Sequence, residues 1–126
     1  MNSKLAKLVE CSMRFGVLLG VIATLVFALY PADALIPRAD GALAHLGAFV
    51  ILTLVSLAAW PRAHWMIVGF ALLGLGAVIE LAQGAMTAGR TADLSDLAFD
   101  AAAIAAGLIV GTLFRRFFSA LPDLSR

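Results

Sequence analysis

Charged side chains are scarce in this chain of 126 residues, of which only 13% are Asp, Glu, Lys or Arg. A soluble globular domain is about 25% charged. Apolar residues take the place of the missing charges: they make up 63% of the sequence, and the mean hydropathy is +1.01. This composition excludes an ordinary soluble domain. It indicates an integral membrane protein whose immediate partner is the lipid bilayer.

Cysteine is almost absent as well, because Cys11 is the only one in the chain. A single cysteine excludes an intramolecular disulfide, and we interpret Cys11 as a small apolar residue at the start of a helix. The sequence also contains no phosphate-binding loop, no zinc-binding signature, no nucleic-acid-binding patch and no internal repeat. We therefore expect no cofactor, no metal site and no nucleic-acid partner, while the oligomeric state stays open.

Four long apolar runs dominate what is present, at about 15–30, 41–60, 65–84 and 96–118. Each is close to the ~20 residues that a helix needs to cross the hydrocarbon core. The runs are continuous and do not alternate in polarity, which favours helices over the strands of a barrel. The sequence thus predicts an all-α membrane protein, a four-transmembrane-helix bundle spanning residues 15–118, with a basic N-terminus at 1–14 and a short tail at 119–126.

Glycine pairs within two of these runs predict close helix packing. Gly16 and Gly20 lie four residues apart in the first run, and Gly107 and Gly111 do so in the last. Small residues at this spacing let two helix backbones approach each other closely. We expect tight packing within the bundle, and dimerisation is a weaker interpretation.

The distribution of Lys and Arg predicts the orientation. Four spans place both termini and the 61–64 turn on one side, which holds seven of the nine basic residues: Lys4, Lys7, Arg14, Arg62, Arg115, Arg116 and Arg126. Because basic residues accumulate on the cytoplasmic side, both termini are predicted to be cytoplasmic in a bacterial inner membrane. Six of the eight acidic residues are then predicted on the outer side: Asp33, Asp40, Glu80, Asp93, Asp96 and Asp100.

The segment that joins the last two runs is the first place to look for chemistry. Glu80 and Gln83 lie near the end of one run, and Asp96 and Asp100 open the next. An acid near the centre of a spanning helix costs roughly 2.5–3.5 kcal/mol, so such residues are rare unless they are paired or functional. Arg90, in the loop between them, can neutralise either set of carboxylates.

One residue of a third helix is expected to join this group. His45 lies about four residues inside the second run, Glu80 about four inside the third and Asp100 about four inside the fourth. At ~1.5 Å per residue, all three are predicted at a shared level roughly 6 Å below the outer end of the bundle.

Two interpretations of this polar group stay open. A network of Arg, Glu, Asp and Gln side chains can hold the helices together without further function, because breaking one buried pair typically costs ~3–5 kcal/mol. Alternatively, acids in a partly dry pocket form a binding or catalytic site that faces a ligand. A metal site is less favoured, because no second His stands at ligand spacing from His45 and His64 is predicted at the opposite end. A catalytic triad is also poorly supported, since no nucleophile motif occurs.

The order of these motifs resembles the VanZ-like family of small bacterial membrane proteins. The residues that carry the resemblance are His45 with Phe49, Glu80 with Gln83, Gly89 with Arg90, Ser95 with Asp96, then Asp100 and Gly107. The resemblance covers about residues 31–112, most of the chain. The sequence departs from the family pattern in three places: Asp40 stands five residues before His45 with no Lys after it, Asp100 replaces a usual Asn, and Ala103 replaces a common Gly.

The resemblance implies a multi-spanning bundle in the cytoplasmic membrane. The member that gives the family its name is associated with low-level resistance to the glycopeptide teicoplanin, which acts on wall precursors outside the membrane. An outward-facing polar site is compatible with that association.

Three functional hypotheses follow from the sequence. We favour a non-enzymatic envelope protein in which His45, Glu80, Gln83, Arg90, Asp96 and Asp100 form a polar site for a lipid head group, a wall precursor or a lipophilic glycopeptide. The second hypothesis is a membrane enzyme that acts on a lipid-linked substrate, with Glu80 or Asp100 as general base and His45 as acid or metal ligand. The third is a structural or assembly partner, in which the polar network only stabilises the bundle.

Overall fold

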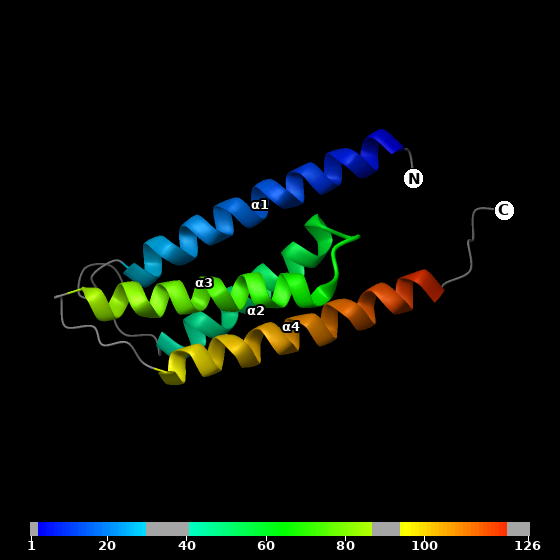
Figure 1. The fold of residues 1–126 in the computed structure, drawn as a ribbon. Coiled ribbons are helices and arrows are strands. Elements are labelled where there is room, and N and C mark those ends of the chain that lie inside the picture. Colours follow the sequence, from blue (N-terminus) through cyan, green and yellow to red (C-terminus); the bar gives the residue numbers. More distant parts are fainter. Residues whose placement is uncertain (1–2, 30–40, 87–93, 121–126) are drawn as a thin grey trace.

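The protein folds into four consecutive antiparallel helices (Figure 1). The structure, a computed structural model, describes residues 3–29, 41–86 and 94–120. The helices are α1 (Ser3–Leu29), α2 (Gly41–Ala59), α3 (Trp65–Ala85) and α4 (Leu94–Ala120). The start of α1 and the end of α4 lie at the same end of the bundle as the turn between α2 and α3.

The bounds of α2, α3 and α4 lie within two residues of the sequence predictions. Pro61 explains the end of α2, because the residue before a proline avoids the helical conformation. At the start of α3, His64 acts as the N-cap, and its Nδ1 accepts a hydrogen bond from the Met66 backbone N–H at 3.3 Å.

The first helix differs from its prediction, because α1 begins at Ser3 and not near residue 15. The charged residues at 1–14 were treated as a segment that precedes the helix. They belong to it instead: Glu10 and Arg14 stand four residues apart on one face of α1, and their side chains form an ion pair at 3.5 Å. The charged residues at this end therefore lie within α1 and do not mark where the helix starts.

The second helix holds the bundle together. α2 packs against α1 on one side and α4 on the other, and it also contacts α3. In contrast, the described residues of α1 and α4 do not pack against each other. The core between the helices is built from apolar side chains, among which Phe49 of α2 and Ile79 of α3 are fully buried.

The predicted close approach is confirmed at Gly20, Gly107 and Gly111, but not at Gly16, where an added Cβ atom would lie 3.8 Å from a methyl of Val55, an ordinary contact. A Cβ atom added at Gly107 of α4 would lie 2.7 Å from the Cβ of Thr53 on α2, and one at Gly111 would clash with a methyl of Leu57. A Cβ atom at Gly20 of α1 would lie 2.8 Å from a methyl of Leu52, on α2. Both α1 and α4 therefore approach α2 through glycine surfaces.

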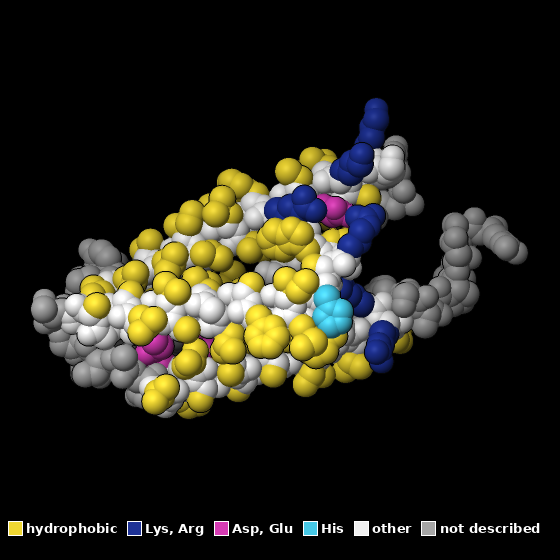
Figure 2. All heavy atoms as spheres, in the orientation of Figure 1, with side chains coloured by type: hydrophobic (Ala, Val, Ile, Leu, Met, Phe, Trp, Pro, Cys, Tyr) yellow, Lys and Arg dark blue, Asp and Glu magenta, His cyan; other side chains and the backbone are white. Residues whose placement is uncertain are grey.

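Large apolar side chains cover the outside of the bundle, as Figure 2 shows. Phe15, Phe70, Ile109 and Phe117 each have more than half of their surface exposed. Exposure on this scale suits a lipid environment, because soluble monomers rarely expose large contiguous apolar patches. Three helices, Ser3–Leu29, Trp65–Ala85 and the Leu94–Phe117 part of α4, are long and apolar enough to cross a membrane, which suggests a multi-pass membrane protein.

The glycine contact between α4 and α2 generates a first prediction. Gly107→Ala puts a methyl group against the Cβ and Cγ2 atoms of Thr53, which lie close to the α2 backbone and have little room to move. Overpacking of this kind typically costs about 1–3 kcal/mol, so we expect a loss of that size in the free energy of unfolding. The measurement is equilibrium unfolding in mixed micelles of a mild detergent and SDS, followed by circular dichroism.

Gly74→Ala on α3 is the matched control, because a Cβ atom there would have no neighbour within 4 Å. This variant should be as stable as the wild type or slightly more so, since Ala is the better helix former. Equal stability of the two variants would contradict the close α2–α4 contact.

Candidate functional site

The candidate site lies at the end of the bundle opposite the termini, where α1 and α3 end and α4 begins. Glu80 and Gln83 stand in the last two turns of α3, on one face because they are three residues apart. Both point into the bundle and not toward lipid: their exposed fractions are 6% and 4%. Figure 2 shows acidic side chains at this end and basic side chains gathered at the other.

Asp100 of α4 enters the same region and is completely buried. Its neighbour is Gly76, one turn before Glu80 on the same face of α3. A Cβ atom added at Gly76 would lie 2.6 Å from the Asp100 Oδ2 atom. Gly76 therefore provides the space that the Asp100 carboxylate occupies between α3 and α4.

The directions of the helices bring Glu80 and Asp100 toward each other. Side chains on a helix tilt toward its N-terminus. In the antiparallel pair α3 and α4, Glu80 therefore tilts into the bundle and Asp100 tilts outward, toward the end where α4 begins. Two buried carboxyl groups from different helices thus occupy neighbouring positions, with Asp100 at the level of Gly76, about one turn deeper than Glu80. We call this region between α3 and α4 the acidic layer.

Gln83 links this layer to the first helix. Its Nε2 atom donates a hydrogen bond of 2.9 Å to the carbonyl oxygen of Ala28 in the last turn of α1. The last four carbonyl groups of a helix have no partner within that helix, and hydrocarbon supplies none. Gln83 therefore acts as a C-cap for α1, supplied from α3.

The other predicted site residues fall in different places. Asp96 lies in the first turn of α4 and is half-buried, where a carboxylate also complements the helix dipole. His45 belongs to α2, but its side chain lies outside the described part of the structure, and so does the whole of Arg90. The structure thus brings Glu80, Gln83 and Asp100 together, and it does not test the expected contributions of His45 and Arg90.

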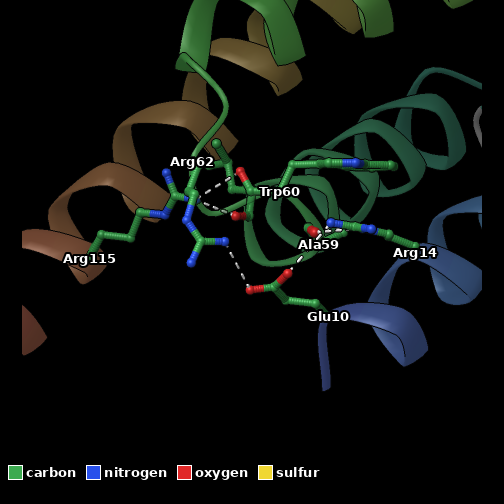
Figure 3. A network of polar contacts seen from close by, with 7 residues as sticks. Glu10, Arg14, Ala59, Trp60, Arg62 and Arg115 are labelled. Atoms are coloured by element: carbon green, nitrogen blue, oxygen red, sulfur yellow. Dashed lines mark hydrogen bonds and ion pairs between the residues drawn. The ribbon is translucent and has the colours of Figure 1, made fainter. Parts of the chain in front are cut away.

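A second polar cluster, which the sequence analysis did not identify, lies at the opposite end (Figure 3). Arg14 of α1 donates from Nε to the carbonyl oxygen of Ala59 at 3.2 Å. Arg115 of α4 donates to the carbonyl oxygens of Leu57 and Trp60. Two arginines from two helices therefore cap the C-terminus of α2, where cations also complement the helix dipole.

An ion pair completes this basic cluster. Glu10 of α1 lies between two arginines, with carboxylate–guanidinium distances of 3.5 Å to Arg14 and 3.6 Å to Arg62 of the α2–α3 turn. The Arg14 guanidinium also lies over the ring of Trp60, 5.9 Å from its centroid. The spacing of Glu10 and Arg14 was a signal in the sequence, but the carbonyl partners depend on how the helices pack.

The described residues contain no group of three or more His, Cys, Asp or Glu side chains that could hold a metal ion. Chemically, the buried layer between α3 and α4 offers two carboxylates and an amide. These groups can accept hydrogen bonds from a ligand or balance a cationic group.

Comparison with known proteins gives no match: no protein-family model, no curated protein and no solved structure is similar to this chain.

The hydrogen bond from Gln83 to Ala28 generates the second prediction. Gln83→Met keeps the length of the side chain but leaves a buried carbonyl without this donor, which typically costs about 1–3 kcal/mol. We expect a loss of that size in the free energy of unfolding, measured in the mixed-micelle experiment described above.

Thr112→Val on α4 is its control. The Thr112 hydroxyl donates to the carbonyl of Leu108, one turn earlier in its own helix, at 2.6 Å. That carbonyl is inside the helix and keeps its backbone partner, so the cost should be smaller than for Gln83→Met. If the control lost as much stability as Gln83→Met, a capping role for Gln83 would be ruled out.

Proposed function

We propose that this chain is a bacterial cytoplasmic-membrane protein of the VanZ-like type that binds an amphiphile at its acidic end. The ligand class is an apolar molecule with a phosphate- or carboxylate-bearing head group: a lipid, a lipid-linked wall precursor or a lipophilic glycopeptide of the teicoplanin kind. The protein binds this ligand and does not transform it. Its role is maintenance of the cell envelope. Protection of the cell against a glycopeptide antibiotic is the consequence of this role that can be tested directly.

The observation that carries the proposal is the burial of Glu80 and Asp100 in one layer between α3 and α4. Burial of two carboxyl groups at the end of a membrane bundle is costly, and ionisable residues inside a membrane commonly mark functional sites. The packing between α3 and α4 also accommodates the buried carboxylate, since Gly76 leaves the space that Asp100 fills.

In this proposal Arg90 is the residue that contacts the ligand. It stands ten residues after Glu80 and ten before Asp100 in the sequence. A guanidinium group held by carboxylates can present its remaining N–H donors to a phosphate or carboxylate in a bidentate arrangement. Glu80 and Asp100 orient Arg90, and His45 donates a further hydrogen bond.

We also propose that the chain crosses the membrane four times, with both termini in the cytoplasm. α2 has 19 residues and lies antiparallel to its neighbours. At ~1.5 Å per residue its length is about 28 Å, comparable to the hydrocarbon core. The basic cluster at the termini supports the orientation, because cytoplasmic ends carry the excess of Lys and Arg.

A purely structural role is the second candidate, and the bond from Gln83 to Ala28 favours it. This contact joins α3 to α1 and needs no ligand. Under this alternative, loss of stability and loss of function should always occur together.

The test is growth of a susceptible Gram-positive host across teicoplanin concentrations, with wild type or Glu80→Gln expressed at equal membrane abundance. We expect wild type to protect and Glu80→Gln to lose most of that protection, because a neutral amide no longer balances Arg90. Unfolding of the purified Glu80→Gln variant is measured in parallel. Normal stability with lost protection separates the binding role from the structural one.

Glu10→Gln provides the control, since it makes the same chemical change in the cluster at the opposite end of the bundle. It should protect as the wild type does. Equal protection by wild type and Glu80→Gln would refute the role of the acidic layer in glycopeptide binding. If neither the wild type nor Glu80→Gln protected the host, glycopeptide resistance would be excluded as the function.

A further inference from the structure

A groove of about 410 Å³ runs between α1, α2 and α3 in the half of the bundle that carries the basic cluster. This volume is within the ~300–1,000 Å³ of typical small-molecule sites. On α3 the groove follows one helix face through Ile67, Ala71 and Leu75. Eight residues of helix correspond to about 12 Å, so the groove extends about that far along α3.

The lining of the groove is apolar almost throughout. Val17 and Val21 line it from α1, and Ser56 is the only polar residue among the described residues of the lining. Such a surface suits a hydrocarbon chain and offers little to a polar ligand.

The end of the groove nearest the termini is strongly basic. Trp60 forms part of its wall, and the Arg14 guanidinium lies over the Trp60 ring. Arg14 stands one turn before Val17 on the same face of α1, so the guanidinium continues the line of the groove. Arg62, next to the wall residue Ala63, has a side chain that is 90% exposed.

The carboxylate of Glu10 is the protein's own anion between these two arginines. It is held between Arg14 and Arg62 at 3.5 and 3.6 Å, contacts at the long end of the range for ion pairs (Figure 3). A phosphate oxygen can take the same place and offers more acceptor oxygens to two guanidinium groups.

We propose that this groove is a binding site for one anionic phospholipid, distinct from the acidic layer at the other end. An acyl chain lies along α3 between Ile67 and Leu75, and the phosphate binds Arg14 and Arg62. Charge complementarity selects this occupant, because an apolar groove that ends at two arginines and a tryptophan matches a lipid at the membrane interface. On the predicted orientation this end faces the leaflet that is richer in anionic lipids.

The experiment uses Trp60 as the reporter. The chain has two tryptophans, so the full-length protein is prepared with Trp65→Phe, which leaves Trp60 as the only one. It is reconstituted into vesicles of unlabelled phosphatidylcholine that contain a small fraction of acyl-brominated phosphatidylglycerol or phosphatidylcholine. Quenching of Trp60 fluorescence reports which lipid occupies the groove.

We expect the anionic lipid to be favoured about fivefold for each arginine that contacts it. Arg62→Gln should lower this preference by about that factor, and Glu10→Gln should raise it by removing the competing carboxylate. Ala71→Phe fills the groove from α3 and should reduce quenching by both lipids. Because Arg62 is almost fully exposed, its substitution leaves the fold intact.

Arg116→Gln is the charge-matched control. Arg116 is exposed at the same end, but it belongs to α4, which does not line the groove. This variant should keep the wild-type preference. An equal loss in Arg62→Gln and Arg116→Gln would show general attraction of the basic end for anionic membranes and would overturn the site. Equal quenching of the wild type by both lipids would overturn it as well.

Discussion

The bundle depends on side chains that satisfy carbonyl groups where its helices end. A helix leaves four carbonyls without internal partners, and a membrane supplies no water to replace them. Two helix C-termini in the described structure are capped by side chains of other helices: Gln83 of α3 caps α1, while Arg14 of α1 and Arg115 of α4 cap α2. Capping therefore also fixes which helices are neighbours, because each donor must lie beside the carbonyl it satisfies.

Helix C-termini are capped at both ends of the bundle, but the charged side chains around the caps are acidic at one end and mainly basic at the other. At one end an amide caps α1, and the carboxylates of Glu80 and Asp100 lie buried nearby. At the other, the guanidinium groups of Arg14 and Arg115 cap α2, and Glu10 links Arg14 to Arg62. Positive charge at a helix C-terminus is favourable, so the basic end gains stability from its charges. The buried acids have no such benefit, which is why they are the stronger candidates for a function.

Much of the fold follows from sequence pattern, whereas the finer contacts depend on three-dimensional packing. The apolar runs and Pro61 predicted α2, α3 and α4 to within two residues, and the spacing of Gly107 and Gly111 predicted a close helix contact. The sequence pattern predicts the start of α1 too late, because the charged residues Lys4 to Arg14 interrupt the apolar run although they lie within the helix. The role of Gly76 was not predictable, since it depends on the register between α3 and α4. The carbonyl partners of the arginines were not predictable either, because they depend on how the helices pack.

The described residues of α1 and α4 do not pack against each other, which bears on how the protein is assembled. A chain is synthesised from its N-terminus, so α1, α2 and α3 are made before α4. At that stage the α2 surface around Thr53 and Leu57 is uncovered, and the C-terminus of α2 has Arg14 as a donor but lacks Arg115. Arrival of α4 covers that surface with its glycines and completes the cap in one step. The last helix thus acts as the closing element of biogenesis, and a chain truncated before it would keep a half-capped α2 exposed to quality-control proteases.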